Sequence, residues 1–306
     1  MKFPAAIDHF FFRPADARAL GICRFLFIAL LLVQYGGVDY GAYGNFPASF
    51  RNPIWLFQLL HVPFVSVRTM GALGVIFKLS LLAVAVGFLT RSSAWIAAIV
   101  GSYVLAIPNN FGRAGHGDDV VVILLWVFAI ARSGDAFSVD SLHKVPPDPS
   151  GEYRWPIRMV WVLMSMVYLA AGVTKLRISG LHWAFSDNMA YTLRAHEVNN
   201  SQPLLHVGVI IAKHAWLVRS LAASTLVIET FFWLALFNKW ARRVLVPAMF
   251  LGHVFIALVM GVMFSQFMFT YVFWLPWERL LHAGAERNRA APAELGESIA
   301  REAGAT

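Results

Sequence analysis

The sequence has little of what soluble and disulfide-bonded proteins usually contain. Its only cysteine, Cys23, lies within an apolar run, so neither an intrachain disulfide nor a cysteine-based metal or redox pair can form. Charged residues make up only 14% of the 306 residues. The sequence also has no Gly-rich phosphate loop, no nucleophile elbow and no histidine spacing typical of a metal site. We therefore expect no metal and none of the common soluble catalytic motifs.

Apolar residues are abundant instead. Hydrophobic residues make up 58% of the chain, and its mean hydropathy is +0.62. No soluble core needs so much apolar sequence, so the composition predicts a polytopic membrane protein. The net charge of +8 does not indicate a nucleic-acid partner, because the basic residues lie in short loops between apolar runs. In such loops they set the topology and meet anionic membrane lipids.

The apolar runs predict an all-α helical bundle with about eight transmembrane helices, although seven remain possible. Several runs are shorter than the ~20 residues that cross a bilayer, and the last two nearly touch. The predicted spans are 19–35, 70–89, 93–108, 119–131, 158–174, 216–237, 244–262 and 263–275.

The distribution of basic residues predicts the orientation. With a cytoplasmic N-terminus, fifteen of the 25 Lys and Arg residues fall inside, eight fall outside and two lie within spans. This asymmetry predicts that both termini are cytoplasmic. We divide the chain into a cytoplasmic lead (1–17), a transmembrane domain (18–283) and a cytoplasmic tail (284–306), the last a disordered segment or a frayed helix. Two long outer segments, 36–69 and 176–215, are expected to cover the outer face.

One apolar run, Met159 to Lys175, ends on a lysine. Read as a helix, it places Tyr168, Gly172 and Lys175 on one face, where the small Gly172 lets a neighbouring helix approach closely. The amine is thus directed towards the bundle near its outer water boundary. The alternative is that Lys175 simply extends to the interface at the end of a transmembrane helix.

Four titratable side chains fall within apolar runs, where charge is costly: Arg24, Lys78, Glu229 and His253. Each needs a partner or a function. One alternative is that they form a buried charge network that fixes the order of the helices and catalyses nothing, for example through Glu229 with Arg24 or His253. The other alternative is that they take part in a reaction.

The residues together resemble a known family. The chain is similar to the transmembrane part of vitamin K-dependent γ-glutamyl carboxylases and to their broader bacterial relatives, the horizontally transferred transmembrane (HTTM) domain proteins. The order and spacing of the matching pieces carry the resemblance, over about residues 14–283. They are Cys23-Arg24-Phe-Leu-Phe, Met70-Gly-Ala-Leu-Gly, Gly87-Phe-Leu-Thr-Arg91, His116, Phe137-Ser-Val-Asp140, Ala171-Gly-Val-Thr-Lys175-Leu176, Trp183, Glu229, His253, Met263-Phe-Ser and Trp277.

The resemblance implies a reaction. In the carboxylases, the lysine that matches Lys175 deprotonates a reduced vitamin K-type quinone, and oxygen addition yields a strong base. This base removes a γ-proton from glutamate, and carbon dioxide adds to the resulting carbanion. The resemblance makes Lys175 the base and His116 its oxyanion or proton partner, with Tyr168, Trp183 and His253 near the quinone. It also implies a peptide or protein substrate on the outer face and a multi-pass location in a bacterial cytoplasmic (inner) membrane.

Physical chemistry sets a condition on this role. A lysine with the reference pKa of about 10.4 is less than ~0.1% neutral at pH 7, so Lys175 must be desolvated to act as a base. A carboxylate such as Glu229 close to the amine would hold Lys175 charged and defeat the role. The chain also departs from the family pattern, because Asn109-Asn110 stand several residues before His116 rather than directly before it.

Two functions of different class follow. The first is a carboxylase-type membrane enzyme that uses a reduced quinone. The second is a non-catalytic membrane protein that binds lipid, quinone or a partner protein, in which the same charges only hold the bundle together.

Overall fold

The computed structural model describes residues 3–112, 115–198 and 203–281, and the predicted cytoplasmic tail, 284–306, lies outside these residues. Every named secondary-structure element among the described residues is a helix. The all-α prediction is therefore confirmed for this part of the chain. The α-helices are α1 (Phe3–Phe12), α2 (Ala17–Tyr35), α3 (Trp55–Leu59), α4 (Val67–Val86), α5 (Thr90–Ala106), α6 (His116–Ile130), α7 (Trp155–Ser179), α8 (His182–Phe185), α9 (Asn188–Val198), α10 (Gly208–Ile211), α11 (Ala215–Phe231), α12 (Leu234–Phe237), α13 (Lys239–Met260) and α14 (Ser265–Phe269). The 3₁₀ helices are η1 (Tyr40–Asn45), η2 (Ala48–Phe50), η3 (Ile107–Phe111), η4 (Val139–Ser141), η5 (Gly151–Tyr153) and η6 (Thr270–Trp274).

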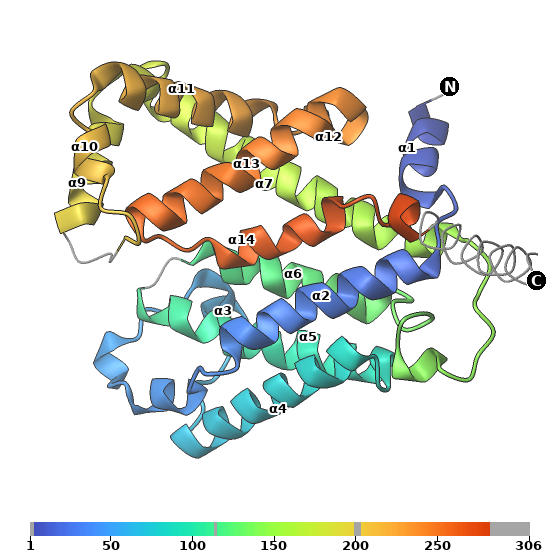
Figure 1. Ribbon diagram of the computed structural model, residues 1–306. Helices are drawn as coiled ribbons and strands as arrows, with labels where there is room; N and C mark the ends of the chain where they lie inside the picture. Colours follow the sequence, from blue (N-terminus) through green and yellow to red (C-terminus); the bar gives the residue numbers. More distant parts are fainter. Residues whose placement is uncertain (1–2, 113–114, 199–202, 282–306) are drawn as a thin grey trace, which may run out of the picture.

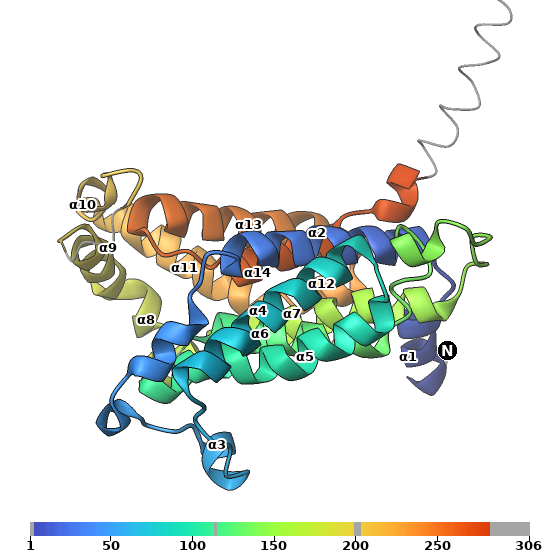
Figure 2. The same cartoon turned by 90° about the horizontal axis from the view of Figure 1, so that it is seen from below.

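The long helices lie side by side and run back and forth across the molecule (Figure 1). Helix α4 packs against α2 and α5, α5 against α6, and α7 against α11. Helix α1 and the last described residues lie at one end of the bundle, whereas α9 and α10 lie at the opposite end (Figures 1 and 2). The main apolar core joins buried side chains of α2, α4, α5, α6, α7 and η6.

Within the part of the chain that the structure describes, five helices are long and apolar enough to cross a membrane. This confirms a multi-pass integral membrane protein but not the predicted number of eight spans. Helices α6 and α11 have 15 and 17 residues, fewer than the ~20 of a typical span. The run 216–237 is divided between α11 and α12, and the run 263–275 is divided between α14 and η6. The five candidate spans are Ala17–Tyr35, Val67–Val86, Thr90–Phe111, Gly151–Ser179 and Lys239–Met260.

A buried arginine joins three parts of the chain near the end of the bundle that carries α1. Arg24 of α2 is fully buried, and its guanidinium donates hydrogen bonds to the carbonyls of Ser133 and Phe137 in the segment between α6 and α7. The turn between α4 and α5 lies against the same segment, because the Asp140 backbone N–H donates to the Gly87 carbonyl. Gly87 has a positive φ of 72°, and a Cβ there would collide with Ser138. This position therefore requires glycine.

Asp140 also caps helix α5. Its carboxylate accepts hydrogen bonds from the backbone N–H of Leu89 and from the backbone and hydroxyl of Thr90. Burial alone would raise the pKa of Asp140, but these hydrogen bonds outweigh it and hold the pKa below its usual value. Three of the pieces that carry the family resemblance, those containing Arg24, Gly87 and Asp140, thus meet in one structural junction.

Replacing Arg24 is expected to destabilise the bundle. Arg24→Met leaves two carbonyls without their donors, at a cost of about 1–3 kcal/mol for each carbonyl that stays buried and unpaired. The matched control is Arg18→Ala on the same helix, since Arg18 pairs with Asp16 at the surface and its side chain is 49% exposed. An exposed pair contributes about 0–1 kcal/mol. Thermal unfolding in nanodiscs measures both variants, and equal small losses would contradict the role assigned to Arg24.

Candidate functional site

The centre of the candidate site is an ion pair between two long helices. Lys175, near the end of α7, places its Nζ 2.6 Å from Oε2 of Glu229 on α11. The side chains are 24% and 13% exposed, respectively. Glu229 therefore pairs with Lys175, and not with Arg24 or His253, the two example partners in the predicted charge network. The pair lies at the edge of the bundle, within reach of a molecule from outside it.

Close packing of the two helices positions this pair. Gly172 of α7, three residues before Lys175, faces Thr230 of α11, the residue after Glu229. A Cβ on Gly172 would lie 2.8 Å from the backbone nitrogen of Thr230 and 3.0 Å from its Cα. The absence of a side chain therefore lets the helix backbones approach, as the sequence spacing predicts. The ion pair forms where the helices are already in contact.

An aromatic ring borders the amine. Trp183 lies on α8, the short helix that follows α7, and Lys175 Nζ stands 5.1 Å from the centroid of its ring. This geometry is that of a cation–π contact, which favours the charged form of the amine. The remaining indole surface is partly exposed. The Lys175 amine thus contacts both the ring face of Trp183 and the carboxylate of Glu229.

The pair bears on the role of Lys175 as a base. The Glu229 carboxylate oxygen lies 2.6 Å from the amine, a distance typical of a charge-assisted hydrogen bond. A carboxylate this close to the amine is the arrangement expected to defeat a free lysine base.

His116 has a different partner from that of Lys175. It begins α6, its side chain is 85% exposed, and its Nδ1 is 3.9 Å from Oδ2 of Asp119. The preceding residue is tied to the asparagine pair, since the Asn109 side chain accepts a hydrogen bond from the backbone N–H of Gly115. The structure therefore gives Lys175 and His116 different partners.

Two of the predicted quinone-contacting residues lie together in the interior. Tyr168 is buried on α7, one turn before Gly172, and its hydroxyl is hydrogen-bonded to that of Tyr271 at 3.0 Å. The ring of His253 on α13 lies 5.8 Å from the Tyr168 ring, and its Nδ1 is bonded to the Met249 carbonyl. Both side chains are packed and have partners. Only Trp183 of the three borders Lys175.

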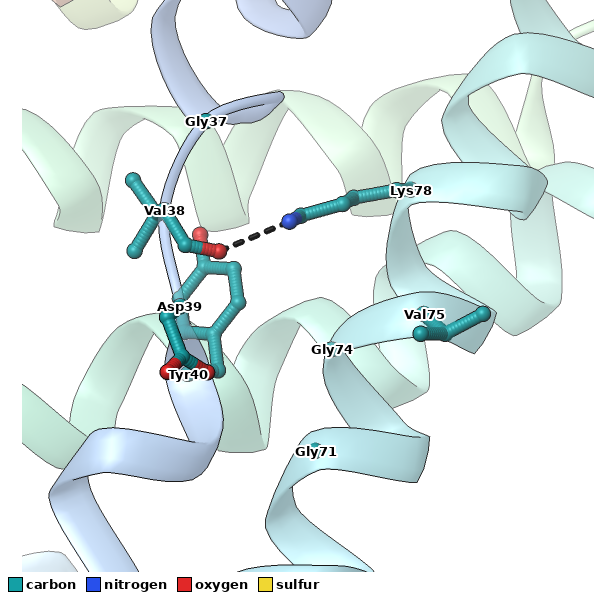
Figure 3. Close-up of a pocket in the computed structure, with 8 residues that line it drawn as sticks. All are labelled: Gly37, Val38, Asp39, Tyr40, Gly71, Gly74, Val75 and Lys78. Atoms are coloured by element: carbon teal, nitrogen blue, oxygen red, sulfur yellow. Dashed lines mark hydrogen bonds between the residues drawn. The ribbon is translucent and has the colours of Figure 1, made fainter.

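The remaining charges of the expected network have partners of their own. Arg24 binds carbonyls at the junction described above. Lys78 of α4 donates a hydrogen bond of 2.7 Å to the carbonyl of Val38. Figure 3 shows this bond at the side of a small hollow, where the Lys78 amine lies beside the Tyr40 ring. Arg24, Lys78, Glu229 and His253 are thus held by separate contacts.

Sequence reasoning missed a second polar cluster. Asp118, in the first turn of α6, is buried and accepts a hydrogen bond of 2.6 Å from the Tyr35 hydroxyl and one of 3.1 Å from the Gln266 amide. Burial and then the charge of Asp118 raise the pKa of Tyr40, which lies between the spans. The available signal was the pair of acids, Asp118 and Asp119, directly before an apolar run. The predicted span begins at residue 119 and therefore leaves Asp118 outside it.

Within the described residues, no group of three His, Cys, Asp or Glu side chains is placed to hold a metal ion.

These features define a class, that of multi-pass helical membrane proteins with an ion pair between two helices at the bundle edge. A family model described as the HTTM domain matches residues 12–278, which is most of the chain. The protein belongs to the HTTM domain family. No curated protein and no solved structure matches the chain. The link to vitamin K-dependent carboxylases is an inference at the level of this family.

The contact between α7 and α11 can be tested with two glycines. Gly172→Ala is expected to push α11 away and to lower the thermal midpoint by several degrees, because the added methyl meets backbone atoms of Thr230. Gly252→Ala on α13 is the matched control, since nothing lies within 4 Å of its added Cβ. There alanine is expected to be neutral or to stabilise the helix by about 0.5–1 kcal/mol. If the two variants unfold at the same temperature, the close approach of α7 and α11 at Gly172 does not contribute to stability.

Proposed function

We propose that the protein is a membrane enzyme of the carboxylase type, in which Lys175 and Glu229 together form the proton-transfer site. The observation that supports this proposal is the position of the pair at the bundle edge, beside the Trp183 ring. Arg24 is, by contrast, fully buried and bonded to backbone carbonyls, as expected of a purely structural charge. The Lys175 pair remains accessible to a ligand.

The pair modifies the role that the resemblance implies for Lys175. While water solvates the site, the ammonium and carboxylate forms are favoured. An apolar ring that displaces this water removes solvation from both charges at once and so destabilises the ionic state. Transfer of one proton from the Lys175 amine to the Glu229 carboxylate then leaves two neutral groups. The neutral amine can accept a proton from a bound hydroxyl, which restores the lysine ammonium.

The residues present fit an aromatic cofactor at this place. The indole ring of Trp183, 5.1 Å from the Lys175 amine, offers a surface on which a flat ring can stack. When bound, a reduced vitamin K-type quinone supplies an acidic hydroxyl and the electrons for the reduction of oxygen. The chain's own residues hold the ring and move the proton. Carbon dioxide and a glutamate-containing peptide or protein complete the reaction implied by the family relation.

A second candidate function follows from the helix packing. Gly172 and Thr230 already bring α7 and α11 together beside the ion pair. This contact favours a structural pair in a non-catalytic protein that binds lipid, quinone or a partner protein. The two candidates differ in what happens when both charges are removed.

Activity and stability of the same variants separate the candidates. The assay follows epoxide formation from a reduced naphthoquinone in nanodiscs, with oxygen, labelled bicarbonate and a glutamate peptide. We expect wild type to form epoxide, and both Lys175→Ala and Glu229→Gln to lose about 10²–10⁴-fold in rate, as for loss of a general acid or base. His116→Ala is expected to have a smaller effect, because His116 does not contact the pair.

The control is the double variant Lys175→Met with Glu229→Met. Replacing a buried pair with apolar residues of similar size is often neutral for stability, so this variant should unfold near the wild-type temperature and remain inactive. Full activity in Lys175→Ala would contradict the proposal. Absence of epoxide from folded wild type, with stability lost in the single variants and regained in the double variant, would favour the structural function.

A further inference from the structure

A groove lies on a part of the bundle that contains neither Lys175 nor Glu229. It has a volume of about 1030 Å³ and is bounded by α2, the first half of α7, the first half of α13 and the chain from α14 to residue 279. Its inner wall is apolar and aromatic, with Trp161, Phe250 and Trp274 among the lining residues. Lys175 and Glu229 are not among them. The groove is therefore separate from the candidate site.

The charge on the groove is strongly one-sided. Of the described residues, six basic side chains line it, and Glu278 is the one acidic side chain that does so. Glu278 is already paired with Arg154 at 2.8 Å. The basic residues come from the beginnings of α7 and α13 and from the chain after η6, which places them at the end of the bundle where α1 lies (Figure 1). They are Arg154, Arg158, Lys239, Arg242, Arg243 and Arg279.

Arg158 is the member of this group that most needs a ligand. Its Nη1 is buried and has no hydrogen-bond partner among the residues that the structure describes. The guanidinium is held between rings, 4.0 Å from the centroid of Trp161 and 4.8 Å from that of Phe10. Arg154 and Arg242 add like charge near Arg158, against the single opposite charge of Glu278. A buried guanidinium donor without an acceptor is unfavourable, and an oxyanion supplies the acceptor.

Other arginines at this end are already engaged. Arg242 donates hydrogen bonds to the carbonyls of Ala235 and Leu236, and Arg154 donates to those of Arg13 and Pro14. These hydrogen bonds occupy N–H donors of Arg242 and Arg154 and hold the two guanidinium groups in place. Among the described residues, no such bond is seen for Arg158, Lys239, Arg243 or Arg279. Arg158, which is partly buried, and Arg243, which is exposed, are the positions to change in a test.

We propose that this groove binds an anionic phospholipid of the surrounding bilayer, with the phosphate against Arg158 and its basic neighbours and an acyl chain along the aromatic wall. An apolar wall that ends in a cluster of cations matches an anionic headgroup carried on a hydrocarbon chain. Basic pockets between transmembrane helices bind lipid headgroups by the same physics. The charge distribution of the sequence predicts that this end faces the cytoplasm, where anionic lipids are presented.

The test counts bound lipids by native mass spectrometry. Purified full-length protein is exposed in detergent to dioleoylphosphatidylglycerol or dioleoylphosphatidylcholine at equal concentration. The acyl chains are identical, so a difference reports the headgroup. We expect wild type to retain the anionic lipid about tenfold more strongly than the zwitterionic one. Arg158→Gln should remove most of this preference and leave retention of the zwitterionic lipid unchanged.

The control removes one positive charge at the same end but outside the groove. Arg91, exposed in the first turn of α5, does not line the groove, so Arg91→Gln should keep the preference. Thermal unfolding is measured for each variant, and Arg243→Gln, at an exposed position, replaces Arg158→Gln if that variant does not fold.

Three results would overturn the proposal. The first is equal retention of the two lipids by wild type. The second is an unchanged preference in both folded groove variants. The third is displacement of the anionic lipid by millimolar inorganic phosphate alone, which would mean that the cations select a free anion rather than a lipid.

Discussion

The burial of Arg24 is the constraint on which much of this bundle depends. A guanidinium sealed in apolar surroundings must find acceptors, and it finds them in the carbonyls of Ser133 and Phe137. Those bonds fix the segment between α6 and α7 against α2, and Asp140 of the same segment then caps α5. One charge thereby sets the relative positions of several helices, and the glycine at position 87 leaves the space that the junction needs.

Lys175 is also a cation that needs a partner within the bundle, but its partner is of a different kind. Its charge is balanced by a carboxylate rather than by backbone carbonyls, and the pair lies where its solvation can change. A proton can move between an amine and a carboxylate, whereas it does not leave an arginine under ordinary conditions. The fully buried Arg24 and the partly exposed Lys175 therefore differ. Arg24 fixes backbone segments, whereas Lys175 joins two helices and is proposed to take part in proton transfer.

The two proposed sites lie towards opposite ends of the bundle. Lys175 is near the end of α7, and the cationic groove begins where α7 starts, so one helix links them. Tyr271 connects the regions locally, because it lines the groove and its hydroxyl is bonded to Tyr168, which lies one turn before Gly172 on α7. The groove and the Lys175–Glu229 pair are thus linked through the aromatic side chains of Tyr271 and Tyr168.

The sequence by itself determined the all-helical membrane class, because hydropathy and helical period are local properties, and it indicated which charges need partners. It also placed Tyr168, Gly172 and Lys175 on one helix face. Only the tertiary structure decided that Glu229 belongs to Lys175, that Arg24 binds backbone carbonyls and that Asp118 joins Tyr35 and Gln266. These contacts join residues 54 to 148 positions apart. Which distant residues meet depends on helix packing, and no local pattern encodes it.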